Sequence, residues 1–375
     1  MSDRAQGRLR VRRMVVKELR QIFRDPMSIR MIFGAPIIQL MLFGYAVNTD
    51  VRHVSTFVVD HDRTAASRQL VEAFTASGYF DLVGSSDSPA ALGRALDLGD
   101  AVIGLEIPAG FGADTKAGRS PAVQLVVDGT NSNTGTVASG YAAKIAQEQS
   151  VRLMRASGRP MPPSVELRAR AWFNPSLESR VYNVPAVIGV IVLHMSLLLT
   201  ALAVVREREV GTLEQLLVSP LTATELMLGK TLPVAGIALT QLMLVTTVAL
   251  LWFDIPLRGS PPVLLMAAIC FIVTGLAFGL FISTLADTQQ EAFLSMFLFL
   301  LPAIILSGFM YPVDTMPWVF QQLTLLNPLR HFLEVIRAVF LKGAGLRELW
   351  PQVGLLALMA TGAVLGAVRR FRSTL

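Results

Sequence analysis

Charged side chains are scarce in this sequence: Asp, Glu, Lys and Arg make up 16% of its 375 residues, whereas a soluble chain carries about 25%. The shortage is concentrated in runs of roughly 18 or more residues with almost no charge, which are typical of membrane helices. Cysteine is scarcer still. The single one, Cys270, lies inside an apolar run, and one cysteine excludes an internal disulfide framework.

Residue patterns that carry enzyme chemistry are also missing. Leu228-Gly229-Lys230-Thr231 resembles the end of a Walker A motif, but the position that requires the first glycine is Thr224. The histidines are scattered and give no pair with metal-ligand spacing on one helix. They are His53, His61, His194 and His331. The sequence therefore predicts neither ATP binding in a P-loop nor a metal centre, and no catalytic residues stand out.

The basic residues gather at the ends of the apolar runs. The formal net charge is +6, and Arg369, Arg370 and Arg372 follow the last run. Basic ends that flank membrane segments place both termini in the cytoplasm, and this distribution argues against a nucleic-acid partner. The basic residues before the first run are Arg4, Arg8, Arg10, Arg12, Arg13, Lys17, Arg20 and Arg24.

Residues 1–27 are expected to form a cytoplasmic amphipathic helix at the membrane surface. Lys and Arg cover most of it, and such a helix favours an anionic leaflet, so membrane lipid is an expected partner. Asp25-Pro26 interrupts it, because proline disfavours helix at the residue before it. Its apolar side is assigned to Leu9, Val15, Val16, Leu19, Ile22 and Phe23, and its candidate interfacial residues are Lys17, Glu18, Arg20, Arg24 and Asp25.

Six membrane spans are predicted from the apolar runs. They cover about residues 28–48, 182–205, 225–253, 263–285, 292–311 and 349–368. The segment 312–347 is too apolar for an ordinary loop and too interrupted by proline for a span. Non-helical backbone at membrane depth is tolerated only inside protein or beside a watery cavity. This segment is therefore expected to form re-entrant or interfacial helices on the external side.

Residues 49–179 differ in kind, because charged residues return and Gly, Ser and Asp separate short elements. Alternating strands and helices predict an inserted α/β domain with a largely parallel sheet. One span precedes it, so it is expected outside the cytoplasm. Polar residues 128–133 fit either turn and N-cap chemistry or an anion site. The expected strands are Val54–Val59, Tyr79–Val83, Ala101–Ile107 and Ala122–Val127, and the expected helices are Thr64–Ser77, Ser88–Leu98 and Asn133–Ala156.

The connection between the second and third spans carries the strongest local signals. After the charged run 206–209, Gly211 suits the left-handed end of a helix. Thr212 and Gln215 match a capping box. Thr222 and Glu225 match a second one, which starts the next span. A short capped helix over 211–220 is one interpretation, and an ordinary capped loop is the other.

Four further positions are candidates, and three of them are interpreted in more than one way. His194, within the second span, lines a substrate route or is a neutral histidine hydrogen-bonded to a neighbouring helix. Tyr311 is assigned to the same route. Asp287 and Glu291 pair with basic residues of the N-terminal helix, contact a partner protein, or are solvated loop charges.

Three stretches resemble one family. EREVGTLEQLLVSPL, residues 207–221, closely resembles the signature of ABC-2 type transporter permeases, the membrane subunits of ABC exporters. VKELRQIFRDP, residues 16–26, resembles the family's N-terminal interfacial helix. Residues 306–343 resemble the segment between the last two spans in the bacterial multidrug-exporter-like branch. His331 departs from the aromatic expected after Pro-Leu-Arg, which affects local packing. The resemblance extends over the entire chain.

The resemblance implies an α-helical polytopic membrane protein with an inserted extracytoplasmic α/β domain, in the bacterial inner membrane. Two copies, or one copy and a homologous permease, form the substrate pathway. In that family the short cytoplasmic helix docks on a separate ATPase subunit, so ATP belongs to the partner and no cofactor is expected here. The implied ATPase-coupling residues are Arg206, Glu207, Glu209, Gly211, Thr212, Leu213, Glu214 and Leu217.

Efflux of multiple amphipathic drugs is the function that the resemblance favours. A mechanotransmission subunit, export of lipid or lipid-linked glycan, and a membrane receptor or enzyme are the alternatives. The need for a periplasmic adaptor stays open.

Overall fold

A computed structural model describes residues 3–46, 53–119, 121–129, 132–156, 178–212 and 222–374. Its internal contacts divide the chain into two compact units. One combines Met1–Asn48 with Ala171–Leu375, and the other is Thr49–Arg170.

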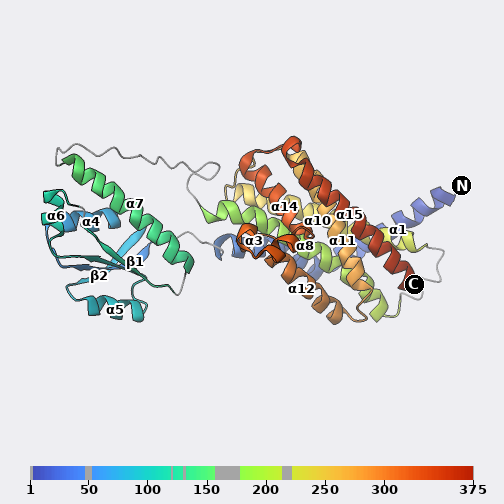
Figure 1. The fold of residues 1–375 in the computed structure, drawn as a ribbon. Helices are drawn as coiled ribbons and strands as arrows, with labels where there is room; N and C mark the ends of the chain where they lie inside the picture. Colours follow the sequence, from blue (N-terminus) through green and yellow to red (C-terminus); the bar gives the residue numbers. More distant parts are fainter. Residues whose placement is uncertain are drawn as a thin grey trace. The chain divides into compact units, whose positions relative to one another are not determined.

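The larger unit is a bundle of helices (Figure 1). Among the described residues, four helices are long and apolar enough to cross a membrane: Ser179–Glu209, Thr224–Leu251, Pro261–Ser283 and Leu346–Arg370. Two shorter apolar helical stretches are Arg30–Tyr45 and Gln289–Ile305. The unit therefore has the make-up of a helical membrane protein. Its elements are α1 Asp3–Arg24, α2 Pro26–Ile29, the π-helical turn η1 Arg30–Gly34, α3 Ala35–Ala46, α8 Ser179–Glu209, α10 Ala223–Leu251, α11 Pro261–Ser283, α12 Gln289–Ile305, the 3-10 turn η2 Val313–Thr315, α13 Trp318–Thr324, α14 Pro328–Arg337, the π-helical turn η3 Ala338–Lys342 and α15 Leu346–Thr374.

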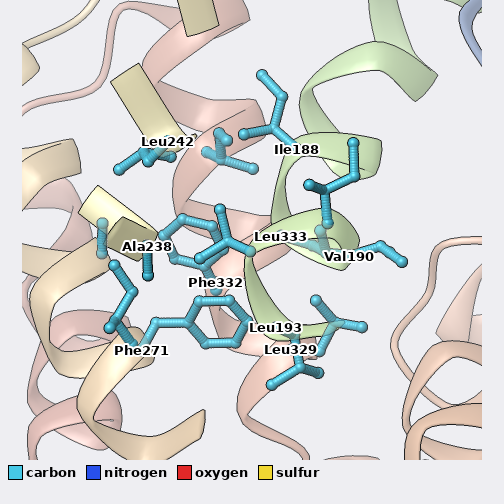
Figure 2. Close-up of a cluster of buried hydrophobic side chains, with 14 of the residues drawn as sticks. Ile188, Val190, Leu193, Ala238, Leu242, Phe271, Leu329, Phe332 and Leu333 are labelled. Carbon is cyan, nitrogen blue, oxygen red and sulfur yellow. The ribbon is translucent and has the colours of Figure 1, made fainter. Parts of the chain in front are cut away.

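Helix α8 is the centre of the bundle and packs against α3, α10, α11, α12 and α14. Beside it the rings of Phe271 from α11 and Phe332 from α14 stack with centroids 4.3 Å apart (Figure 2). Helices α8 and α11 approach closely where Gly275 and Gly279 face α8. A Cβ at Gly279 would lie 2.9 Å from the carbonyl oxygen of Leu197. Small residues four apart allow such a backbone approach in membrane bundles.

The structure adds a protein-facing side to α1 and shortens one predicted span. Of the apolar residues predicted for α1, Leu9, Val16 and Phe23 are exposed, and Val15, Leu19 and Ile22 are partly buried. Met14 and Glu18 are buried because α1 also packs on α10. The span expected to reach Tyr311 ends at Ile305, because the chain turns there through a left-handed glycine at 308.

The interrupted segment after α12 forms short helices, as expected. Helix α13 is largely exposed, and Trp318 has 72% of its surface accessible. Helix α14 is buried between α8, α11 and α15, with Leu329, Phe332 and Ile336 fully enclosed. Its start is capped by Asn327, whose side chain also donates to the Ala303 carbonyl at 2.7 Å. The segment is therefore tied into the bundle.

The smaller unit is an α/β fold. Its strands lie in the order β2-β1-β3-β4. β1 pairs in parallel with β2 and β3, and β4 runs antiparallel to β3. Helices α4 and α7 cover one face of the sheet and α5 the other (Figure 1). The largely parallel sheet is confirmed. The elements are β1 Val54–Asp60, α4 Ala65–Ala76, β2 Phe80–Ser86, α5 Pro89–Asp97, β3 Ile103–Ile107, α6 Phe111–Ala117, β4 Gln124–Val127 and α7 Ser132–Ala156.

Helix α6 was not predicted, because its seven residues show no clear helical period. The loop before it is fixed by Asp62, whose carboxylate accepts the backbone N–H groups of Gly110 and Gly112, both at 2.9 Å. Asp62 also accepts from the Thr64 hydroxyl. The ambiguous polar stretch 128–133 lies partly outside the described residues.

Candidate functional site

The expected coupling residues lie at the C-terminal end of α8. Helix α8 ends at Glu209, and Gly211 takes the left-handed conformation, with φ of 76°, as predicted. Thr212 folds back on the helix: its N–H donates to the Glu207 carbonyl at 3.0 Å, and its hydroxyl donates to the Glu207 carboxylate. The predicted coupling residues Leu213, Glu214 and Leu217, and the capping box that involves Gln215, lie outside the described residues.

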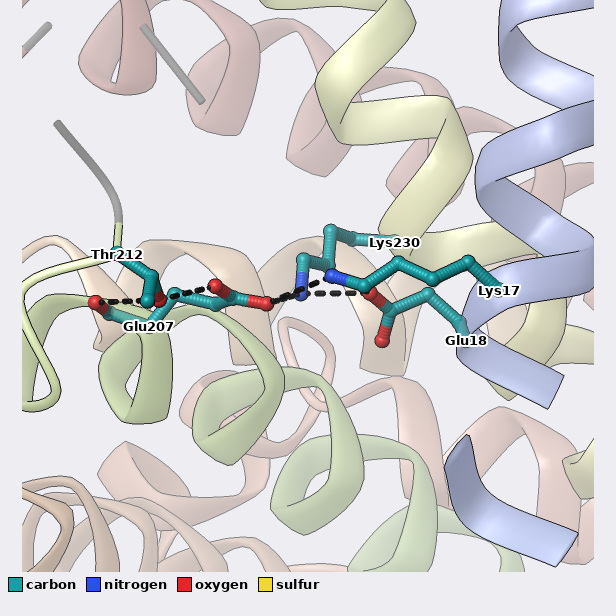
Figure 3. A network of polar contacts seen from close by, with 5 residues as sticks. All are labelled: Lys17, Glu18, Glu207, Thr212 and Lys230. Carbon is teal, nitrogen blue, oxygen red and sulfur yellow. Dashed lines mark hydrogen bonds and ion pairs between the residues drawn. The ribbon is translucent and has the colours of Figure 1, made fainter. Parts of the chain in front are cut away.

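Four charged side chains from three helices meet at this point (Figure 3). Lys230 of α10 places its ammonium 2.7 Å from Glu207 Oε1 and 2.8 Å from Glu18 Oε1. Lys17 of α1 lies 3.3 Å from Glu207 and 3.4 Å from Glu18. Two cations and two anions thus balance, and α1, α8 and α10 are joined through one charge network.

The network is shielded from solvent on one side. The side chain of Lys230 is 5% exposed and those of Glu18 and Glu207 are 10% and 12% exposed, whereas Lys17 is 50% exposed. Burial alone would lower the pKa of Lys17, but the carboxylates of Glu18 and Glu207 outweigh this effect and raise the pKa above its usual value. Lys17 therefore stays charged at physiological pH and supports the buried part of the network.

A second set of contacts fixes α1 along the first turns of α10. Arg10 donates to Glu225 Oε1 at 2.8 Å. Glu225 is also the N3 residue of a capping box with Thr222, so the predicted second capping box is confirmed. One turn further, Gly229 leaves room for the buried Met14, and a Cβ at 229 would lie 2.5 Å from its sulfur. Helix α1 is therefore docked on the protein, and its exposed basic residues face outward.

A third set joins the end of α8 to the turn before α12. Arg208 donates to the Ala286 carbonyl at 2.8 Å and lies 3.2 Å from Asp287. Glu209 accepts from the Gln289 amide at 2.7 Å. Asp287 therefore pairs with α8 and not with the N-terminal helix.

The other predicted residues of this region are spread around the network. Arg206 is exposed, and within the described parts of the chain its side chain has no hydrogen bond or ion pair. Arg20 and Arg24 are exposed on α1. Asp25 begins α2 by accepting the Met27 N–H at 3.1 Å.

The two residues assigned to a substrate route lie away from this region. His194 is partly buried in the middle of α8, and its ring meets Phe297 of α12 edge-on at 6.3 Å. Within the described residues no hydrogen bond to the ring is found, so the neighbouring-helix bond expected for it is not observed. Tyr311 is 59% exposed beyond the end of α12. The structure does not bring these two residues together with each other or with the charge network.

Lys230 is the residue that sequence reasoning missed. The sequence singles it out only as part of an incomplete Walker A motif, and the structure places it inside the apolar helix α10. The signal that could have found it is a lysine within an otherwise apolar helix, since a charge in such a position needs a partner.

Comparison with known proteins now identifies the family. The sequence profile described as "ABC-2 family transporter protein" matches residues 27–369. The chain belongs to this family of membrane permeases.

Several curated bacterial proteins are similar over nearly their whole length. The probable multidrug ABC transporter permease YbhR of Escherichia coli K12 is 34% identical over 93% of this chain and 94% of its own. The probable multidrug ABC transporter permease YbhS of the same strain is 32% identical over 89% of both chains. The inner membrane transport permease YhhJ is 29% identical over 96% of both. The resemblance seen in the sequence is thus confirmed, and the chain is a multi-pass membrane permease of an ABC transporter.

Proposed function

We propose that this chain forms the substrate pathway of an ABC exporter as a homodimer, or as a heterodimer with a homologous permease. Separate ATPase subunits bind ATP and drive it, and amphipathic drugs are the favoured substrates. The observation that carries the proposal is the charge network of Lys17, Glu18, Glu207 and Lys230. Its member Glu207 lies four residues before the segment 211–220, which is proposed to dock on the ATPase.

The network gives that segment a rigid base. A displacement applied beyond Thr212 reaches Glu207, and through Lys230 it reaches both α10 and α1. ATP binding need only favour one of two packings of the helices, because a ligand shifts an equilibrium by its differential affinity for the two states. Arg206, Glu207, Glu209, Gly211 and Thr212 are proposed to transmit this motion.

The distribution of aromatic residues supports the proposed orientation. Exposed aromatic side chains lie where α3 and α10 end and where α8 and α15 begin. At the ends of α3 and α10, the Trp252 indole donates to the Tyr45 hydroxyl at 3.0 Å. Tyr182 and Trp350 are exposed at the first turns of α8 and α15. The opposite helix ends carry more basic residues, including Arg206 and Arg208 of α8 and Arg369 and Arg370 of α15, whereas Arg180 and Arg347 lie at the aromatic ends. Aromatic belts mark membrane interfaces, and Lys and Arg mark the cytoplasmic side.

This orientation completes the proposed topology. Both termini and α1 lie at the cytoplasmic face, and α1 contacts membrane lipid through its exposed basic residues. The stretches 28–48 and 292–305 supply two further spans, which gives six. The α/β unit and the short helices over 312–347 lie outside the cytoplasm. These short helices form a re-entrant segment. Tyr311 and His194 border the substrate pathway. A periplasmic adaptor is a further proposed partner.

The decisive test measures coupling. Glu214→Arg or Leu217→Arg is expected to abolish substrate-stimulated ATP hydrolysis by the purified complex and drug efflux from cells, because a new positive charge prevents docking. Glu72→Arg is the matched control, since it makes the same change at an exposed position on α4 of the α/β unit. Unchanged substrate-stimulated ATP hydrolysis and drug efflux in the Glu214 and Leu217 variants would refute the proposal.

A further inference from the structure

A cleft beside the charge network has the make-up of a site for an amphipathic anion. It measures about 260 Å³ and is enclosed by α1, η1, α8, α10 and the first turn of α12. Its polar lining includes Glu18, Glu207 and Lys230 of the charge network. Its apolar lining consists mainly of Ile22, Ile32, Leu199, Leu202, Pro233 and Val234.

The charges that line the cleft are committed to partners, with one exception. Glu18 and Glu207 are engaged by Lys230, and Asp25 caps α2. Arg206 also lines the cleft, and among the described residues its side chain has no hydrogen bond or ion pair. The available charge in the cleft is therefore a guanidinium, which matches phosphate geometry through two parallel hydrogen bonds.

The position of the cleft selects the kind of anion. Arg206 lies immediately after the apolar run of α8 that ends at Val205, so it stands at the level where a membrane helix meets the lipid headgroups. Leu199 and Leu202 line the cleft within that apolar run, where an acyl chain would continue into the membrane. Free phosphate would leave these apolar walls without a partner.

We infer that this cleft holds a glycerophospholipid, with its phosphate on Arg206 and one acyl chain along the apolar wall. The lipid wedges between α1 and the bundle at the helices that the charge network joins. It is a resident ligand, so its binding does not depend on which substrate the permease exports.

The test uses the full-length chain, purified in detergent with its ATPase partner. Native mass spectrometry follows the binding of dioleoylphosphatidylglycerol, dioleoylphosphatidylethanolamine and dioleoylglycerol, which lacks phosphate. Both phospholipids are expected to bind, and dioleoylglycerol is not. Arg206→Gln is expected to weaken phospholipid binding about tenfold, the size of one lost charge-assisted contact. Ala203→Phe, which fills the cleft without changing charge, is expected to lower occupancy as well.

Arg208→Gln is the matched control. It removes the same charge two residues further on, where Arg208 is held by Ala286 and Asp287 outside the cleft. Equal weakening by Arg206→Gln and Arg208→Gln would show general attraction to a basic surface and overturn the inference. Equal binding of dioleoylglycerol would overturn it, as would displacement of the lipid by equimolar inorganic phosphate. Loss of the ATPase from Arg206→Gln with the lipid retained would assign Arg206 to the protein interface instead.

Discussion

Replacing Lys230 with methionine is expected to destabilise the permease strongly. The ammonium lies within 2.8 Å of both Glu18 and Glu207 and is 5% exposed. Its loss leaves two carboxylates that are 10% and 12% exposed facing only the half-exposed Lys17. Removing one partner of a buried ion pair costs about 3–5 kcal/mol. We expect about 3 kcal/mol, the lower end, because Glu207 keeps contacts to Lys17 and Thr212.

The assay is equilibrium unfolding of the detergent-solubilised protein, with Lys17→Met as the comparison. That variant removes a half-exposed cation and is expected to cost about 1 kcal/mol or less. The double variant Glu207→Gln with Lys230→Met should recover part of the loss, since one unpaired carboxylate is neutralised. Equal costs for the two lysine variants, or no recovery in the double variant, would refute a buried, mutually dependent network.

Two further predictions test the docking of α1 and the loop of the α/β unit. Gly229→Leu is expected to displace α1, because a side chain at 229 clashes with Met14. Faster proteolysis of α1 would report this displacement. Gly236→Leu is the control, because a side chain at 236 meets open space, and α1 should then be cleaved at the parental rate. Equal cleavage rates for the two variants would contradict the packing of α1 on α10. Hydrogen bonds from the Thr64 hydroxyl and from three backbone N–H groups lower the pKa of Asp62. The ionised Asp62 therefore stabilises the fold at a pH above its unfolded-state pKa of about 3.9. This contribution is lost as the pH falls through the lower pKa of the folded state. By scanning calorimetry the stability gap between the parent and Asp62→Asn should therefore narrow below about pH 4, and a constant gap would be evidence against a depressed pKa.

Much of the local structure could be predicted from short-range patterns. The capping box of Thr222 and Glu225, the helix end at Gly211 and the alternating elements of the α/β unit all depend on residues within a few positions of one another. Such signals act through the backbone and need no knowledge of the tertiary fold. They located the end of α8 and with it the candidate site.

The buried face of α1 could not be predicted in this way. Hydrophobicity gives no reason to bury Glu18, but Glu18 is buried because Lys230 reaches it from a helix 212 residues away. A charge that is costly alone becomes acceptable once its partner is present, and only the fold reveals the partner. The antiparallel direction of β4 is likewise a tertiary property.

The glycine seam between α8 and α11 has a consequence for motion. A Cβ added at Gly279 would lie 2.9 Å from the Leu197 carbonyl oxygen, so the backbones of the two helices are in close contact there. We therefore expect α8 and α11 to move together as one rigid body during a transport cycle. Any opening of a passage would then have to come from the outer helices, swinging around a pair that keeps its shape.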